Sequence, residues 1–160
     1  MNNIPLTKGF FAIIDDDDYE ELSKHRWYCS TYGYAVRSVS KFAGRRDLIY
    51  MHIQLLGREK GLEIDHINGN SLDNRRCNLR RVTHQQNVHN SKPQFGGSST
   101  YKGVYWHNGA KKWVSRIQCN GKLKHIGCFT SEKEAAKAYN YVARACFGEY
   151  ARLNILEEEN

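Results

Sequence analysis

Long apolar runs are missing from this chain of 160 residues. No stretch approaches the roughly 20 consecutive apolar residues that a membrane-spanning helix needs, and the start MNNIPLTKGFF lacks the basic and then apolar layout of a secretion signal. Hydrophobic residues still make up 40% of the chain and aromatic residues 12%, which is enough apolar material for a folded core. These features predict a soluble protein without a membrane segment.

Cysteines in disulfide or metal-binding patterns are also missing. The five cysteines are odd in number, and no two of them form a CxxC motif. This spacing argues against both a disulfide framework and a structural zinc site. We therefore expect a reducing compartment, namely the cytoplasm.

Acidic residues are scarce in the second half of the chain. Residues 96–156 carry 10 basic and 3 acidic side chains, whereas residues 1–95 carry 14 basic and 11 acidic ones, and the whole chain has a net charge of +7. Lysine and arginine gain affinity for polyanions by displacing the counterions of phosphates. The charge distribution therefore favours a nucleic-acid partner for the second half.

Glycine, serine and proline gather around residues 93–99, where the periodicity of the flanking regions lapses, as it does in flexible linkers. We therefore divide the chain into a first domain over residues 1–92, a linker over 93–99, a second domain over 100–156 and an acidic tail over 157–160. Each domain is long enough to fold, because domains of about 50 to 150 residues are common.

The first domain combines strands and short helices. Strand-like runs cover residues 10–14, 27–39 and 47–53, and a short helix is expected over residues 16–25. The run Asp15–Asp18 is interpreted as an N-cap and a partner of the helix dipole, with a metal site as the less favoured alternative.

The second domain is predicted as three strands followed by one helix. The strand-like runs 101–106, 112–119 and 122–129 are joined by Asn-Gly turn signals, which indicates an antiparallel meander. A capping box at 131–134 begins a helical repeat of apolar residues that ends at Gly148. One helix can cover one face of three strands.

The polar residues of segment 62–87, LEIDHINGNSLDNRRCNLRRVTHQQN, follow an ordered pattern. The Asp65-His66 pair lies between isoleucines, as in a short strand, and the sequence NGN that follows is a turn. A brief helix from about Thr83 would bring Asn87 back toward that strand. The segment therefore predicts a β-turn-β-helix unit that closes on Asp65.

Residues 4–91 resemble the HNH endonucleases with a ββα-metal active site, in the branch found among phage and intron-encoded homing endonucleases. The resemblance rests on Asp65-His66, on Asn78 and Asn87 at the motif spacing, and on the sequences DHINGN, DNRRCNLRRVT and QQN. It implies that His66 is the general base that deprotonates a water, that Asp65 and Asn87 hold one divalent ion, and that Asn78 holds the loop and orients His66.

The third motif position is an asparagine here, not a histidine. Oxygen ligands from Asp65 and Asn87 suit Mg²⁺, with Mn²⁺ as a possible substitute. His84 is a competing ligand, because it lies three residues before Asn87 and could share its helix face. His52 is more simply a core residue than a contact to DNA or to the phosphate, and it is given no catalytic role.

Four arginines in the motif region have no acidic residue among them. We expect them to contact DNA phosphates, with a solvated face as the alternative. They are Arg75, Arg76, Arg80 and Arg81.

Residues 100–154 resemble the AP2 DNA-binding domain of the ethylene-response factors, on the sequences YKGVYW, KKWVSRI and GKLKHIGCFTSEKEAAKAYNYVARACFGEYARLN. The resemblance implies that the three-stranded sheet, and not the helix, lies in the major groove. Alternation along 112–119 puts Lys112, Val114, Arg116 and Gln118 on the exposed face and the residues between them toward the helix. Arg116 and Gln118 could pair with guanine and adenine, while Lys102 and Lys112 would meet phosphates. The predicted DNA contacts of this half are Lys102, Tyr105, His107, Lys112, Arg116, Gln118 and His125.

Taken together, these features predict an α+β protein with a ββα-metal HNH nuclease domain and a small three-stranded antiparallel sheet packed on one helix. The implied function is cleavage of double-stranded DNA in a bacterial or phage-infected cell, with site choice from the AP2-like domain. One-strand or two-strand cleavage, a monomer or a homodimer, and a homing, restriction-like or phage-exclusion role all stay open. The alternative is a DNA-binding regulator with an inactive nuclease half, which the retention of the whole motif disfavours.

Overall fold

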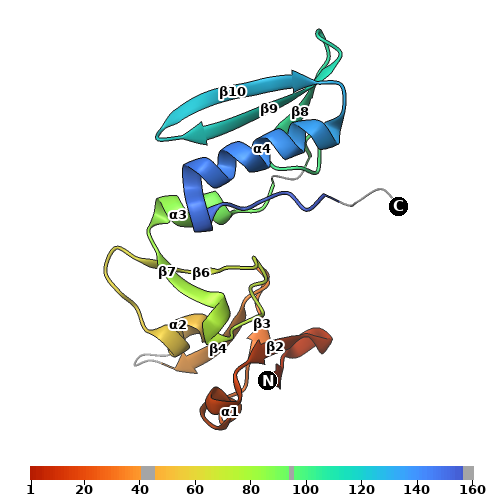
Figure 1. Ribbon diagram of the computed structural model, residues 1–160. Helices are drawn as coiled ribbons and strands as arrows, with labels where there is room; N and C mark the ends of the chain where they lie inside the picture. Colours follow the sequence, from red (N-terminus) through yellow and green to blue (C-terminus); the bar gives the residue numbers. More distant parts are fainter. Residues whose placement is uncertain (41–45, 94–95, 157–160) are drawn as a thin grey trace. The chain divides into compact units, whose positions relative to one another are not determined.

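The computed structural model describes residues 1–40, 46–93 and 96–156. The chain forms two compact units, Met1–Asn87 and Val88–Asn160, called here the N-terminal and the C-terminal unit. The boundary between them falls within a helix and not at the predicted linker. Residues 94 and 95 of that linker and the predicted tail 157–160 lie outside the described residues. Several small antiparallel sheets and few helices make up both units, consistent with the predicted α+β class (Figure 1).

The described residues of the N-terminal unit form three small antiparallel sheets and short helices. The first sheet pairs β1 (Asn2–Pro5) with β2 (Phe11–Ile14), and the second has the order β3 (Tyr28–Cys29), β4 (Ala35–Ser40) and β5 (Arg46–Tyr50). The third sheet pairs β6 (Glu63–His66) with β7 (Leu79–Val82). The helices are α1 (Asp16–Ser23), α2 (Met51–Leu56) and the first part of α3 (His84–Asn90), which continues into the C-terminal unit, with short 3₁₀ turns η1 (Thr7–Gly9) and η3 (Arg76–Asn78).

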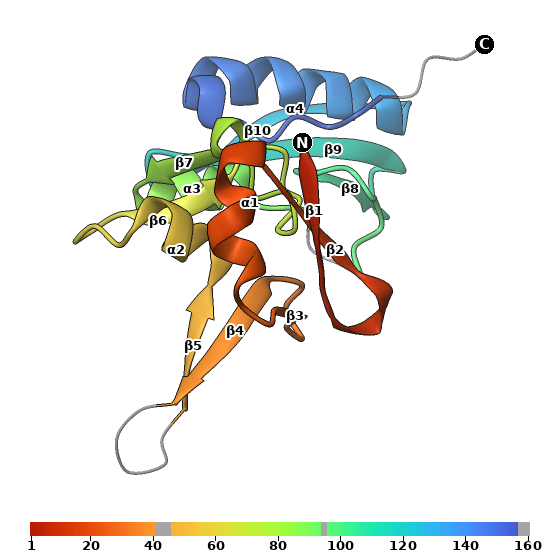
Figure 2. The same ribbon diagram turned by 90° about the horizontal axis from the view of Figure 1, so that it is seen from below.

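Two predicted strands differ from the structure. The expected strand 27–39 is split into β3 and β4 by a turn, in which Gly33 adopts a φ of 80° that favours glycine. The expected strand 47–53 ends at Tyr50, and α2 follows directly (Figure 2). An apolar run this short fits the period of a strand and of a helix equally well, which explains why α2 was predicted as part of a strand. His52 therefore lies on a helix, not on a strand.

The core of the N-terminal unit joins its first two sheets to α1 and α2. Its fully buried members include Ala12, Ile14, Leu22 and Met51. The indole of Trp27 donates to the carbonyl of Leu22 at 2.8 Å, which satisfies the polar atom of that buried ring.

In the C-terminal unit, the residues that the structure describes form one antiparallel sheet covered on one face by a long helix (Figure 1). The strands β8 (Val104–His107), β9 (Lys112–Cys119) and β10 (Lys122–Phe129) have the order β10-β9-β8. The helix α4 (Glu132–Phe147) is followed by the 3₁₀ turn η4 (Gly148–Tyr150). The predicted meander and helix are confirmed at this level, although Ser131 makes no side-chain capping bond at the start of α4.

Two glycines fix this unit locally. Asn120 and Gly121 have φ values of 54° and 72°, as the predicted two-residue hairpin turn between β9 and β10 requires. Gly103 has a φ of 75°, and a Cβ there would lie 2.2 Å from Cδ2 of Tyr139. Gly103 therefore lets the backbone before β8 approach α4 closely. No helix in the described part of the chain is both long and apolar enough to span a bilayer.

Candidate nuclease site

The motif residues lie on β6, β7 and α3, which follow one another in the predicted order. Strand β6 pairs antiparallel with β7, so that Asp65 faces Arg80 and His66 faces Leu79 across the ladder. Helix α3 begins after Thr83, whose Oγ1 accepts from the backbone N–H of Gln86 at 3.3 Å while the side chain of Gln86 accepts from the N–H of Thr83 at 2.8 Å. This capping box fixes the start of α3, the helix that carries Asn87.

Asn78 fixes the loop that follows His66. Its Oδ1 accepts from the N–H of Asn68 at 3.0 Å, and its Nδ2 donates to the carbonyl of Asp73 at 2.7 Å and to Oδ1 of Asn68 at 3.1 Å. Its backbone carbonyl accepts from the N–H of Ile67 at 2.9 Å. Asn78 is buried, so these bonds satisfy its amide.

His66 is buried among polar and aromatic side chains, with an exposed fraction of 5%. Its ring centroid lies 5.2 Å from that of His52 and 6.0 Å from that of Tyr34. Its Nε2 lies 3.4 Å from Oδ1 of Asn74, and this contact favours the tautomer with the ring proton on Nε2 and the lone pair on Nδ1. Burial lowers the pKa of His66 below its usual value, which keeps the ring neutral and able to accept a proton.

Asp65 is buried and paired with Arg80. Oδ2 of Asp65 accepts from Nε of Arg80 at 3.0 Å and lies 2.9 Å from its Nη2. The two residues are cross-strand neighbours, so the antiparallel register brings them together. A metal ion at Asp65 would share this carboxylate with Arg80.

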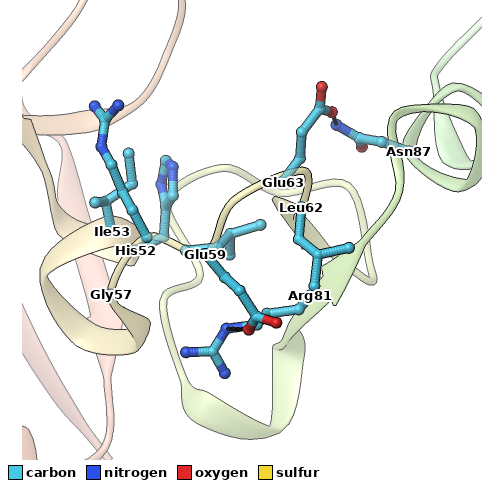
Figure 3. A pocket seen from close by; sticks show the side chains of 10 residues that line it. His52, Ile53, Gly57, Glu59, Leu62, Glu63, Arg81 and Asn87 are labelled. Carbon is cyan, nitrogen blue, oxygen red and sulfur yellow. Dashed lines mark hydrogen bonds and ion pairs between the residues drawn. The ribbon is translucent and has the colours of Figure 1, made fainter.

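Asn87 and His84 both bond to Glu63, a residue outside the site predicted from sequence. Nδ2 of Asn87 donates to Oε2 of Glu63 at 2.6 Å, and Nδ1 of His84 lies 2.8 Å from Oε1. Figure 3 shows the side chains of Glu63 and Asn87 pointing toward each other. These bonds, that of Asn87 first, hold the pKa of Glu63 below its usual value. The alternation of β6 could have revealed Glu63, because it shares the face of Asp65 two residues away.

The donor chemistry fits a hard divalent cation. The predicted ligand pair contributes the carboxylate of Asp65 and the amide of Asn87, and oxygen donors of this kind suit Mg²⁺. Over residues 1–40, 46–93 and 96–156, no group of three or more His, Cys, Asp or Glu side chains is arranged to hold a metal ion. Of the predicted ligand pair, only Asp65 belongs to these four residue types, because Asn87 would bind through an amide oxygen.

A cavity of about 370 Å³ lies beside Glu63 and Asn87 (Figure 3). His52, to which no role was given from sequence, lines it from α2. Burial lowers the pKa of His52 to about 4, so its ring is neutral at neutral pH. The cavity is lined by His52, Ile53, Gly57, Arg58, Glu59, Leu62, Glu63, Ile64, Arg81 and Asn87.

The four motif arginines are each paired with a carboxylate of the same chain, which the sequence did not predict. Arg75 binds Asp73 through Nε at 2.7 Å and Nη2 at 2.6 Å, and Arg76 binds Asp18 at 2.9 and 2.7 Å. Arg80 pairs with Asp65 as described above, and Arg81 lies 3.3 Å from Glu59. Most of the acidic partners come from other parts of the fold, so the arginine run alone does not reveal them. These bonds hold the four side chains in this structure, and contacts with DNA phosphates stay a prediction.

The acidic run Asp15–Asp18 is tied into the fold in the same way. Asp15 stands at the N-cap of α1 without a side-chain capping bond, and its Oδ2 accepts from the N–H of Arg76 at 2.7 Å. Asp18 binds the guanidinium of Arg76. The other three residues of the run lie in the first turn of α1, as the helix interpretation predicted.

The exposed face of the C-terminal sheet carries most of the predicted DNA contacts. Lys112, Arg116 and Gln118 are exposed, while Ile117 and Cys119 are buried. Val114, expected on the exposed face, is buried, because a central sheet position is enclosed by its neighbours on both strands.

Arg116 is the best-defined member of this face. Its guanidinium lies 4.7 Å above the ring of Tyr105, in a cation–π contact that restricts both side chains. His125 pairs with Arg116 across β9 and β10 and lies 3.7 Å from Sγ of Cys128. His107 is exposed opposite Lys112 at the end of β8.

Lys102 does not lie on this face. It precedes β8, and its Nζ donates to the carbonyls of His89 and Ser91, both at 2.7 Å, at the C-terminal end of α3. Burial lowers the pKa of Lys102 to about 8. The sequence prediction placed Lys102 on the exposed face because it continued the alternation of strand residues to a position that lies before β8 begins. The side chain instead satisfies carbonyls that a helix end leaves without partners.

His89 and Asn154 are also structural in the C-terminal unit. The ring of His89 stacks on that of Phe147 with centroids 3.7 Å apart. Asn154 accepts from the N–H of Lys102 at 2.7 Å and donates to its carbonyl at 3.1 Å. These contacts hold the segments before β8 and after η4 together.

Comparison with known proteins supports a nuclease. A family model described as HNH endonuclease matches residues 54–89. A protein of Acanthamoeba polyphaga mimivirus named uncharacterized HNH endonuclease is 33% identical over 153 residues, which are 94% of this chain and 78% of that protein. Protein 3.8 of Escherichia phage T7 is 30% identical over 93 residues, which are 58% of this chain and 76% of that protein.

A plant protein matches a smaller part. An ethylene-responsive transcription factor-like protein of Arabidopsis thaliana is 37% identical over 68 residues, which are 42% of this chain and 27% of that protein. The mimiviral relative, by contrast, is matched over most of both chains, and the matched family model covers β6, β7 and all but the last residue of α3. On these grounds, the chain belongs to the HNH endonuclease family.

Proposed function

We propose that this protein is a divalent-metal-dependent endonuclease that hydrolyses phosphodiester bonds of double-stranded DNA. The observation that carries the proposal is the environment of His66, a buried and neutral imidazole next to the carboxylate of Asp65 on β6. A base needs a lone pair at neutral pH and a fixed ring, and the Asn74 contact supports both.

The proton transfer is assigned to Nδ1 of His66. The contact with Asn74 supports the tautomer that carries the ring proton on Nε2, in which Nδ1 would take the proton of the attacking water. Asn78 holds the loop after His66 and thereby limits the movement of the ring. Cleavage of this kind leaves 3′-hydroxyl and 5′-phosphate ends.

Asp65 and Asn87 would hold the cation, Mg²⁺ with Mn²⁺ as a substitute. When bound, the ion supplies charge stabilisation at the scissile phosphate and at the leaving oxygen. Without the ion, Arg80 balances the buried charge of Asp65, because an unpaired carboxylate would be costly to bury.

Site choice is assigned to the C-terminal unit in its AP2-like role. Arg116 and Gln118 lie on the exposed sheet face, where bidentate side chains can reach base edges, and Lys112 adds charge for phosphates. The plant relative, whose name describes a transcription factor-like protein, supports this assignment. The two units together would form a site-selective endonuclease of the homing type.

Digestion of a randomised duplex DNA library with the wild-type protein tests the proposal. We expect breaks that need added Mg²⁺ or Mn²⁺, that carry 5′-phosphates and that share a sequence on sequencing of the cut ends. A supercoiled plasmid with the preferred site then shows whether nicked circles or linear molecules form. Binding to the preferred DNA without any cleavage would contradict the proposal and would favour a regulator with an inactive nuclease half.

A further inference from the structure

Glu63 contacts both candidates for the second ligand of the proposed metal site. Its two carboxylate oxygens are used separately, Oε2 by the amide of Asn87 and Oε1 by the ring of His84. Both contacts reach from β6 to α3, and the bond to Asn87 is the shorter, at 2.6 Å. The carboxylate therefore fixes the side chains of α3 that face the site.

The amide of Asn87 can serve as a ligand only in one of its two orientations. A metal ion binds the amide oxygen and not the NH₂ group, and rotation by half a turn exchanges the two. An ionised carboxylate accepts hydrogen bonds and donates none, so Glu63 is satisfied only when Nδ2 of Asn87 faces it. Oδ1 is then directed away from Glu63 and is presented as the donor atom.

The position of Glu63 on β6 supports a role in this site. Glu63 and Asp65 are two residues apart on one strand and share a face, so the side chain that orients one predicted ligand is adjacent to the other. Glu63 and Asn87 also line the same cavity. Partners of metal ligands commonly set both ligand orientation and metal affinity.

We propose that Glu63 is the positioning residue that sets the amide of Asn87 with Oδ1 as the metal-binding atom. This inference rests on the proposed function, in which Asn87 is a metal ligand. His84 is then a second hydrogen-bond partner of Glu63 and not a ligand. Glu63 itself takes no part in the proton transfer assigned to His66.

The direct test is Mn²⁺ binding to the full chain without DNA, measured by isothermal titration calorimetry. Glu63→Gln should weaken binding about tenfold or more, because the introduced amide can donate to Oδ1 of Asn87 and so favours the reversed orientation of that side chain. The contact itself is kept, so the melting temperature should stay near that of the wild type. Mn²⁺ affinity equal to that of the wild type would overturn the proposal.

The double variant Glu63→Gln/Asn87→Asp separates orientation from simple loss of a charge. A carboxylate presents an oxygen in either orientation, so this variant should regain most of the affinity that Glu63→Gln loses. Failure to regain it would overturn the orientation role. The comparison requires that the double variant is folded, with a melting temperature equal to that of the wild type. The single variant Asn87→Asp shows whether the metal site accepts a carboxylate at that position.

His84→Ala is the matched control, because His84 bonds the other oxygen of Glu63. Its Mn²⁺ affinity should remain close to that of the wild type, and a loss as large as that of Glu63→Gln would assign the ligand role to His84 and overturn the proposal. The proposed function fails separately: a wild-type protein that binds no Mn²⁺ and cuts no DNA would overturn both ideas. A wild-type protein that binds and cuts, with unchanged binding in Glu63→Gln, would overturn this inference alone.

Discussion

Single polar side chains around the nuclease motif are fixed by partners far away in sequence. Asp18 binds Arg76 across 58 residues, and Glu63 binds Asn87 across 24. Buried charges need such compensation, which applies to the carboxylates of Asp65 and Asp73, whereas the Arg81–Glu59 pair is exposed. The consequence for function is that the roles of individual residues follow from their partners more than from their charge.

Asn74 is expected to act in catalysis through its contact with His66. We expect Asn74→Leu to lower the rate of DNA cleavage by about tenfold to a hundredfold, because the substitution removes the acceptor that fixes the tautomer of His66. Single-turnover cleavage at saturating protein measures this effect. Mn²⁺ binding should be retained, and a cleavage rate equal to that of the wild type would show that Asn74 does not fix the base.

His52 should make stability depend on pH. Its pKa is about 4 in the folded protein, lowered mainly by burial, so the unfolded chain binds more protons between about pH 4 and pH 6.5. The contribution of His52 is therefore full above pH 6.5 and is lost as the pH falls toward 4. The difference amounts to roughly 3 kcal/mol at most.

Urea unfolding at pH 7 and at pH 4.5 measures this dependence. The variant His52→Phe keeps an aromatic ring beside His66 but cannot be protonated, so its free energy of unfolding should fall less between the two pH values than that of the wild type. Burial lowers the pKa of His66 as well, which leaves part of the dependence in the variant. An equal fall in the free energy of unfolding in the two proteins would contradict the account of His52.

At the scale of elements, Gly103 is the position where the backbone before β8 packs closely against α4. A Cβ at Gly103 would approach Tyr139 of α4 to 2.2 Å and the carbonyl of Arg116 to 2.6 Å, at a φ of 75°. We expect Gly103→Ala to lower the free energy of unfolding by about 2 to 4 kcal/mol through backbone strain and overpacking.

Gly121→Ala provides the matched control for this prediction. Gly121 has a similar φ of 72°, yet its added Cβ would meet no atom within 4 Å among the described residues. It should cost only the strain of the left-handed backbone, about 1 kcal/mol. Urea denaturation of both variants gives the comparison, and equal losses would show that the contact with α4 does not matter.

Some elements could be predicted from sequence because their signals are local. The Asn120-Gly121 turn, the start of α4 and the order of β6, β7 and α3 all follow from short patterns. The change from β5 to α2 at Met51 could not be predicted in this way, because a few apolar residues fit either element. The contacts of Lys102 and Glu63 were also missed, since each partner lies on another element of the fold.

At the scale of the whole molecule, the proposed function gives the chemistry to the N-terminal unit and DNA reading to the C-terminal unit. This division predicts that the two activities can be changed separately. Arg116→Ala should weaken binding to the preferred site by about 1 to 3 kcal/mol and broaden the set of sequences cut, because Arg116 on the exposed sheet face is the proposed base contact.

The control for Arg116 is Lys137→Ala, which removes one exposed positive charge from α4. Electrophoretic mobility shifts with preferred and unrelated duplexes measure both variants. Lys137→Ala should leave the preference between the two duplexes unchanged. If Arg116→Ala also leaves that preference unchanged, Arg116 does not read bases.

The most direct test of the central claim is the cleavage of a preferred duplex in Mg²⁺ by the wild type and by His66→Ala. We predict that His66→Ala binds the duplex as the wild type does and loses cleavage by a factor of about 10² to 10⁴, the usual contribution of a general base. Cleavage by His66→Ala at the wild-type rate would contradict the assignment of His66 as the base.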